Sequence, residues 1–381
     1  MTGAPKVEWQ EQGQPRSCSW RSEAGNPPPR RVHIADDTLT ADAAYRLATE
    51  GTGLLWRGDF QNARQLLHAL ARRADRKPRQ ADKETGATTE AFHRHRMMQA
   101  QRARVLSMLM MQLEGDYGIS LRRAPDVRIA CSEAWGAADG APSVASLREL
   151  LGLIGAHEWR KKGVEVPALG PPPDNRIHPH YGVFSPVRGE YIDLVARAPL
   201  PSTVLAFDVG TGTGVLAAVL ARRGVQQVVA TDQDRRALAC ARENMARLRM
   251  AARVEVIEAD LFPPGVAPLV VCNPPWLPGR ASAPIEHAVY DEGSRMLRRF
   301  LTGLVAHLAP AGEGWLILSD LAEHLGLRSR QELLAWIDGA GLRVTGRNEA
   351  RPRHPKASDP EDPLHGARSK EVTALWRLAA A

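Results

Sequence analysis

The sequence has 381 residues and a formal net charge of +7 at pH 7. Its length suits two domains, and no apolar run reaches the roughly 18 residues that would span a membrane. The N-terminus lacks the apolar stretch of a secretory signal, and the four cysteines form no C-x-x-C pair, so we expect a cytoplasmic protein with reduced thiols, no membrane partner and no metal. The positive charge leaves two interpretations open, a solvated surface or a polyanionic partner.

The N-terminal third shows weak structural signals. Residues 1–33 are rich in glycine, proline, glutamine and charge without sustained periodicity, which predicts a disordered arm. From Thr38 to Arg73 the apolar residues recur at helical spacing and indicate one or two amphipathic helices, the second with Asp59 near its start. A charged linker over residues 74–90 follows.

The next segment is expected to contain one long helix over residues 91–118, with its methionines packed in a core. A strand is expected over residues 127–135, followed by a helix that ends near Arg160–Lys162. The stretch ALGPPPDNR, residues 168–176, predicts an inter-domain connection. The expected domains are a mainly helical substrate-recognition domain over residues 34–173 and a second domain over residues 174–381.

Strand and helix signals alternate in the second domain, which predicts an α/β fold with a largely parallel sheet. Helices are expected over Gly214–Arg223 and Asp234–Leu248. Seven strands of one open sheet are expected at Val204–Val209, Val228–Thr231, Val254–Glu258, Leu269–Cys272, Gly314–Ser319, Leu342–Thr345 and Val372–Arg377.

A glycine-rich loop, FDVGTGTGV, joins the first of these strands to a helix. Gly210, Gly212 and Gly214 let the backbone approach a ligand closely, and the free amides at the helix start favour a nucleotide-type ligand. The loop also approximates the G-x-G-x-x-A fingerprint of dinucleotide-binding proteins, so NAD is an alternative ligand. Asp208 before the first glycine suits a cationic ligand group instead, and no Tyr-x-x-x-Lys pair for hydride transfer lies near the loop.

Two acids follow at the ends of the next two predicted strands. Asp232 lies about 20 residues beyond the glycines, where a carboxylate can accept hydrogen bonds from both hydroxyls of a ribose. The alternative role of Asp232 is a helix cap, but Asp234 suits the cap better. Asp260 follows the third strand, within reach of an adenine amino group. Ligands of open α/β sheets bind at this carboxyl edge.

The fourth predicted strand ends in Asn273-Pro274-Pro275-Trp276. An amino nitrogen conjugated to a ring or carbonyl is a poor nucleophile, because its lone pair is delocalised. The Asn273 side-chain oxygen and the Pro274 carbonyl can accept hydrogen bonds from such a nitrogen, while the proline pair fixes the backbone and Trp276 stacks on the planar acceptor. The alternative is a plain turn, in which Asn and Pro are common, but the position of the motif favours catalysis.

Residues from about 178 to 378 resemble class I S-adenosylmethionine-dependent methyltransferases with an N-P-P-[YFW] motif, and their small methyltransferase domain most of all. The resemblance rests on D-x-G-x-G-x-G, two acids and N-P-P-aromatic in this order. It implies a Rossmann-like seven-stranded domain, S-adenosylmethionine as cofactor, and a segment around Ser185 and Arg188 that closes over the cofactor. The catalytic residues that it implies are Asn273, Pro274, Pro275 and Trp276, and the cofactor-binding residues are Phe184, Pro186, Asp208, Gly210, Thr211, Gly212, Gly214, Asp232, Asp260 and Asn273.

The resemblance implies methylation of a planar amino or amide nitrogen and leaves the acceptor open. The net charge, the arginines of the N-terminal helices, the basic clusters at residues 72–79 and 160–162, and Trp276 favour an exocyclic amino group of a base in RNA or DNA. The alternative acceptor is a release-factor glutamine, although Asp291–Ser294 depart from the corresponding stretch of glutamine methyltransferases. A non-catalytic binding protein with this fold is an alternative of a different class.

Overall fold

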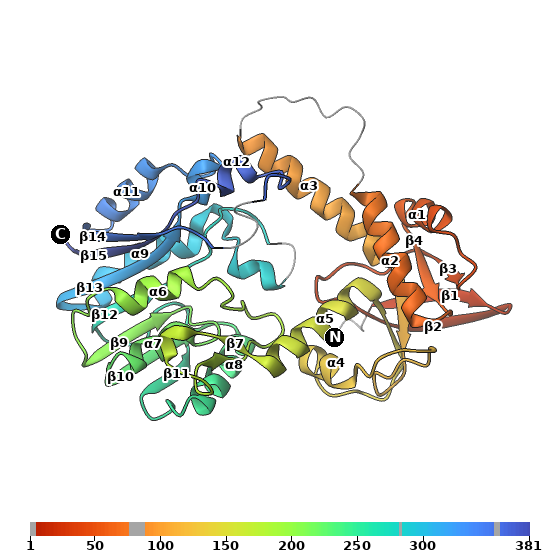
Figure 1. Ribbon diagram of the computed structural model, residues 1–381, viewed down its shortest axis with the longest axis horizontal. Helices are drawn as coiled ribbons and strands as arrows, with labels where there is room; N and C mark the ends of the chain where they lie inside the picture. Colours follow the sequence, from red (N-terminus) through yellow and green to blue (C-terminus); the bar gives the residue numbers. More distant parts are fainter. Residues whose placement is uncertain (1–4, 76–87, 282–283, 354–358) are drawn as a thin grey trace. The chain divides into compact units, whose positions relative to one another are not determined.

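The computed structural model describes residues 5–75, 88–281, 284–353 and 359–381 (Figure 1). The chain divides into two compact units, one of residues 1–86 and 93–158, the other of residues 87–92 and 159–381. Most of the predicted charged linker, residues 76–87, and part of the basic cluster at residues 72–79 lie outside the described residues.

The predicted boundary at residue 173 is wrong, because the glycine- and proline-rich segment before it is part of the second unit. Val166, Leu169 and Ile177 are buried in the core of that unit, so the segment packs as structure and does not act as a linker. The short elements of this segment are β7 (Val164–Glu165), η1 (Pro167–Leu169) and β8 (Arg176–Ile177).

The first unit is built around a six-stranded mixed sheet in the order β1-β2-β6-β5-β4-β3. The prediction of a disordered arm is therefore wrong, and the expected helical domain contains a sheet that the sequence did not predict. β1 and β2 pair as an antiparallel hairpin, and Val7, Trp9 and Trp20 pack on one face of it. Buried and exposed residues alternate along these strands, but the many polar residues between the buried ones hide this pattern in the sequence. The strands are β1 (Lys6–Glu11), β2 (Gln14–Arg21), β3 (Arg31–Ala35), β4 (Thr52–Trp56), β5 (Leu109–Leu113) and β6 (Ser143–Ser146).

The helices of this unit match the predictions in part. Asp59 accepts a hydrogen bond from the backbone N–H of Gln61 and caps α2, as predicted. The expected helix over residues 91–118 ends at Ser107, since the following residues form β5. The expected strand over residues 127–135 is a helix, because its small apolar residues reach the core at helical spacing. The helices are α1 (Ala41–Thr49), α2 (Phe60–Ala74), α3 (Thr88–Ser107), α4 (Arg128–Trp135) and α5 (Leu147–Lys162), of which α3 and α5 each have one end in the second unit.

The second unit contains one seven-stranded sheet in the order β11-β10-β9-β12-β13-β15-β14, which confirms the predicted α/β fold. The first five strands in this order run parallel, and β15 pairs antiparallel with both β13 and β14. The chain order reverses between β9 and β12, so ligands are expected at the carboxyl ends of these strands. The strands are β9 (Leu205–Val209), β10 (Gln227–Asp232), β11 (Val254–Glu258), β12 (Ala267–Cys272), β13 (Leu308–Ser319), β14 (Leu342–Ala350) and β15 (Thr373–Ala380).

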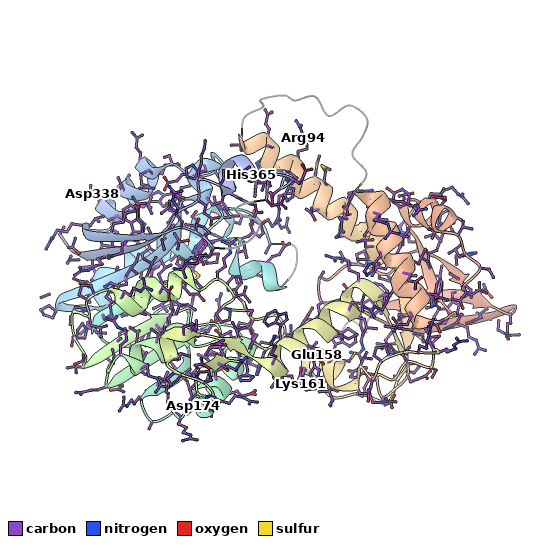
Figure 2. All side chains as sticks on the ribbon, in the orientation of Figure 1. Arg94, Glu158, Lys161, Asp174, Asp338 and His365 are labelled. Carbon is purple, nitrogen blue, oxygen red and sulfur yellow. The ribbon has the colours of Figure 1, made fainter. Side chains whose placement is uncertain are left out.

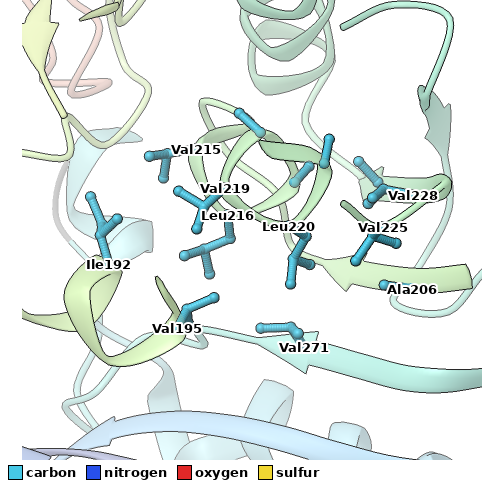
Figure 3. Close-up of a cluster of buried hydrophobic side chains, with 14 of the residues drawn as sticks. Ile192, Val195, Ala206, Val215, Leu216, Val219, Leu220, Val225, Val228 and Val271 are labelled. Atoms are coloured by element: carbon cyan, nitrogen blue, oxygen red, sulfur yellow. The ribbon is translucent and has the colours of Figure 1, made fainter. Parts of the chain in front are cut away.

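Apolar cores lie on both faces of this sheet. On β9, Ala206 packs on the side of α6 and α7, whereas Phe207 packs on the side of α9 and α11. Figure 3 shows Val219 and Leu220 of α7 within the first of these cores. The helices are α6 (Glu190–Arg197), α7 (Val215–Arg222), α8 (Arg235–Arg247), η2 (Pro284–Ala288), η3 (Glu292–Ser294), α9 (Arg295–His307), α10 (Leu321–His324), α11 (Arg330–Gly339) and α12 (His365–Arg368).

Gly214, which begins α7, is required by backbone geometry and by space. Its φ is +82°, and an added Cβ would lie 3.0 Å from the Met245 Cε and 3.3 Å from the Ala241 Cα. We expect Gly214→Ala to lower the free energy of unfolding by about 1–3 kcal/mol in chemical denaturation. The control is Gly339→Ala in α11, where nothing lies within 4 Å of an added Cβ. This variant is expected to be neutral or slightly more stable, so equal losses in both variants would contradict the argument.

Candidate active site

A cavity of about 1160 Å³ opens in the second unit where the parallel strands end. The loops that follow β9, β10, β11 and β12 all contribute to its wall, so the structure brings most of the predicted site residues together. The wall includes Phe184, Gly210, Thr211, Gly212, Asp232, Asp260, Asn273, Pro274, Pro275 and Trp276.

Asp208 lies beneath the glycine loop and does not line this cavity. Its side chain is 1% exposed, and Oδ2 accepts hydrogen bonds from the Thr211 hydroxyl at 2.6 Å and the Ala217 N–H at 3.0 Å. Burial raises the pKa of Asp208 to about 6, against the opposing effect of these hydrogen bonds. The expectation that Asp208 faces a cationic ligand group is therefore wrong: it joins the loop to the first turn of α7. Of the other predicted cofactor residues, Gly214 and Pro186 also lie outside the cavity wall.

Asp232 is half-buried in the cavity wall. Its Oδ2 accepts a hydrogen bond from the Gly212 N–H at 3.0 Å, and its Oδ1 accepts one from the Asp234 N–H at 2.9 Å. Burial raises the pKa of this carboxyl group, while the backbone hydrogen bonds oppose the rise. Because a carboxylate oxygen can accept two hydrogen bonds, each oxygen keeps capacity for a ligand hydroxyl. The helix cap is Asp234, as predicted, since its side chain accepts from the Arg236 N–H.

Asp260 also lies in the wall, but it is paired with a residue that the sequence did not single out. Arg299 on α9 donates to Asp260 through Nη1 at 3.1 Å and Nη2 at 2.9 Å. The Arg299 hydrogen bonds lower the pKa of the Asp260 carboxyl group. This bidentate pair is exposed, so a ligand amino group at Asp260 would share the carboxylate with Arg299.

Asn273 is held by its neighbour in the same motif. The indole Nε1 of Trp276 donates to the Asn273 Oδ1 at 2.9 Å. The Arg188 guanidinium lies 5.9 Å from the centre of the Trp276 ring, and the ring packs against both apolar cores of the sheet. Trp276 therefore fixes the amide of Asn273, a role that the sequence did not predict, and Asn273 Oδ1 keeps one further acceptor position.

A buried carboxylate in the cavity wall was missed altogether. Glu371 is 3% exposed and accepts a hydrogen bond from the Ser319 hydroxyl at 2.7 Å and one from the Arg188 Nη1 at 3.3 Å. Arg188 thus bridges the Trp276 ring and Glu371. No motif marks Glu371, which stands 183 residues from Arg188, so a single sequence carries no signal for this contact.

The start of α9 contributes Asp291, from the stretch that departs from glutamine methyltransferases. Asp291 is 9% exposed, and its Oδ2 accepts hydrogen bonds from the Met296 N–H at 2.8 Å and the Leu297 N–H at 3.3 Å. Burial raises the pKa of this carboxyl group. Asp291 thus binds two backbone N–H groups in the first turn of α9, in the wall of the cavity.

The geometry at the carboxyl edge agrees with a comparison with known families. Residues 175–325 match the family model described as methyltransferase small domain. The second unit contains a methyltransferase small domain. The prediction of a class I, S-adenosylmethionine-dependent methyltransferase domain of Rossmann-like fold is confirmed by this match together with the seven-stranded sheet.

Three curated relatives illustrate the range of the similarity. Release factor glutamine methyltransferase of Cereibacter sphaeroides is 31% identical over 182 residues, which cover 42% of this chain and 65% of that protein. Ribosomal protein L11 methyltransferase of Rhodopseudomonas palustris is 36% identical over 35% of this chain and 39% of that protein. The tRNA1(Val) (adenine(37)-N6)-methyltransferase of Shewanella amazonensis is 27% identical over 52% of this chain and 92% of that protein. This chain therefore matches less than two thirds of the length of the first two relatives.

The described residues also bear on metal ligands, on membrane-spanning helices and on the state of the cysteines. Among the described residues, no group of three or more His, Cys, Asp or Glu side chains is placed to hold a metal ion. Within the same ranges, no helix has both the length and the apolar character needed to cross a membrane. Cys18, Cys131, Cys240 and Cys272 are free and buried.

The Trp276 hydrogen bond gives a testable role for the indole. We expect Trp276→Phe to keep most of the ring packing but to lose the bond to Asn273. This loss lowers kcat for methyl transfer by about two- to tenfold, since one hydrogen bond contributes about 0.5–1.5 kcal/mol. Trp336→Phe is the control, because Trp336 on α11 also lies under an arginine, Arg298 at 5.4 Å, but does not line the cavity. Equal kcat in wild type and Trp276→Phe would remove the proposed role.

Proposed function

We propose that this chain transfers a methyl group from S-adenosylmethionine to an exocyclic amino group of a base in RNA. The observation that carries the proposal is the position of Asn273: its Oδ1 is fixed by Trp276 in the same cavity that contains Asp232. One cavity thus combines an acceptor pair for an amino group with a carboxylate suited to a ribose.

The cavity wall fits the proposed cofactor. Asp232 would accept hydrogen bonds from the ribose hydroxyls, because the Gly212 and Asp234 N–H groups occupy only one acceptor position on each oxygen. The backbone of the glycine loop lines the cavity next to Asp232. The volume of about 1160 Å³ exceeds that of a typical pocket for one drug-sized ligand, so it leaves space for a planar acceptor beside the cofactor.

Bound S-adenosylmethionine would supply an electrophilic methyl group on a positively charged sulfur. The chain's contribution is to orient the acceptor nitrogen. Asn273 Oδ1 and the Pro274 carbonyl would accept its two N–H groups and direct its lone pair toward the methyl group. The nitrogen becomes acidic once the new N–C bond has formed, and its proton can then pass to water, so the step requires no strong base.

Two observations support RNA as the acceptor: the net charge of +7 and the similarity to a relative whose name specifies a tRNA adenine. The alternatives are DNA and a protein glutamine, the latter suggested by the name of the Cereibacter relative. The proposal assigns substrate recognition to the first unit and a cytoplasmic location to the protein, with which the four free cysteines agree.

The test is transfer of a radiolabelled methyl group from S-adenosylmethionine to separated RNA, DNA and protein from a host that lacks this activity. We expect label in RNA. Asn273→Ala is expected to reduce it by at least about 100-fold, the scale for one positioned polar group in a catalytic site. Asp232→Ala should instead weaken cofactor binding, measured by calorimetry, far more than Asn273→Ala does.

The labelled fraction, the effect of Asn273→Ala and the two cofactor affinities each test a different part of the proposal. Label confined to DNA or to protein would overturn RNA as the acceptor while leaving methyl transfer intact. Label that persists in Asn273→Ala would contradict the role of the N-P-P-W motif. Equal losses of cofactor affinity in the two variants would contradict the division of roles between Asp232 and Asn273.

A further inference from the structure

Helix α3 contains a long stretch without a single fully buried side chain. From His93 to Arg104, twelve residues, every side chain is exposed or half-exposed. The helix enters the core of the first unit only at Val105 and Leu106, which are 1% and 3% exposed. Most helical stability in proteins comes from packing on a core, and this stretch places no side chain in one.

Five exposed side chains share one face of this stretch. Counted from the first of them, the other four lie three, four, seven and ten residues further along the helix, which places all five along one side. They are Arg94, Met97, Met98, Gln101 and Arg104. We call these five residues the α3 stripe. Met97 is 71% exposed and Met98 is 52% exposed, so the expectation that the methionines of this helix pack in a core is wrong for these two.

The stripe is cationic at both ends. Arg94 and Arg104 are separated by about 15 Å along the helix axis, from a rise of about 1.5 Å per residue. No aspartate or glutamate occurs in the sequence between Glu90 and Glu114. Figure 2 shows the side chain of Arg94 extending from the helix.

The two arginines of the stripe differ from other arginines of the same unit. The side chains of Arg94 and Arg104 form no hydrogen bond or ion pair with any of the described residues. By contrast, Arg102 on another face of α3 is bound by Asp75 at 2.7 Å, and Arg57 is bound by Glu11. The charge of the stripe is therefore not neutralised within the described chain, which favours a polyanionic ligand.

We propose that the α3 stripe docks the phosphate backbone of the RNA whose base is methylated, an inference that rests on the proposed RNA acceptor. Arg94 and Arg104 contact phosphates on two parts of the RNA, and the flexible side chains of Met97 and Met98 pack against the sugars between them. Phosphate contacts of this kind position a nucleic acid without reading its sequence, so the cavity in the second unit selects the base.

The experiment measures binding of the full chain to an unmodified tRNA transcript by filter binding over a range of salt concentrations. We expect Arg94→Glu/Arg104→Glu to weaken binding at least tenfold and to reduce the slope of log K against log salt by about 1.4 to 1.8, the value for two lost phosphate contacts. The matched control is Arg46→Glu/Arg64→Glu, which changes the net charge equally at exposed positions on α1 and α2. The control is expected to weaken binding less than threefold.

Two further variants separate charge from folding. Arg94→Lys/Arg104→Lys keeps the charge and is expected to retain most of the affinity. Arg94→Gln/Arg104→Gln removes the charge without adding carboxylates, and it takes the place of the glutamate pair if that variant loses helicity. The proposal would be overturned if Arg94→Gln/Arg104→Gln bound the transcript as tightly as wild type, or if the stripe and control glutamate pairs lost equal affinity. It would also be overturned if a double-stranded DNA of equal length competed as well as the transcript.

The failure of this inference can be distinguished from the failure of the proposed function. If wild type methylates RNA and the stripe variants bind and methylate it equally well, only the inference fails. If wild type methylates protein alone, the proposed acceptor fails, and a loss of tRNA binding in the stripe variants then shows only that the stripe binds RNA, not that it docks a methylated substrate. In every variant, unchanged affinity for S-adenosylmethionine confirms that the second unit remains folded.

Discussion

The buried carboxylate of Asp208 is the constraint on which the candidate active site depends. It ties the Thr211 hydroxyl in the glycine loop to the Ala217 N–H in the first turn of α7. That helix is buried along most of its length, so the loop is fixed to the core of the unit. Asp232 binds the same loop from the next strand through the Gly212 N–H. The carboxylates of Asp208 and Asp232 thus both hold the glycine loop, Asp208 from the core of the unit and Asp232 from the cavity wall.

A second set of contacts fixes the opposite side of the cavity. Glu371 accepts hydrogen bonds from the Ser319 hydroxyl and from Arg188. The Arg188 guanidinium lies over the ring of Trp276, and the Trp276 indole donates a hydrogen bond to Asn273. These contacts join the ends of β12 and β13 to the segment before α6. The orientation of the proposed acceptor amide therefore depends on residues that are distant in the sequence, and this preorganisation is what the proposed chemistry requires.

The sequence predicted the second unit well and the first unit poorly, for physical reasons. Runs of buried β-branched residues mark parallel strands, and the glycines and the N-P-P-W motif mark the turns after them. In β2 only Cys18 and Trp20 are buried among polar residues, so its composition suggested disorder. The contact of Arg188 with Glu371 and the burial of Asp208 arise only from tertiary packing, which a single sequence does not encode in a local pattern.

The central claim is that the cavity at the carboxyl edge is built for S-adenosylmethionine, although its glycine loop also approximates a dinucleotide fingerprint. Calorimetric titration of the purified chain with S-adenosylmethionine and, separately, with NAD tests this claim most directly. We expect saturable binding of S-adenosylmethionine at one site per chain and no measurable binding of NAD. Affinity for NAD without affinity for S-adenosylmethionine would show instead that the cavity is a dinucleotide site.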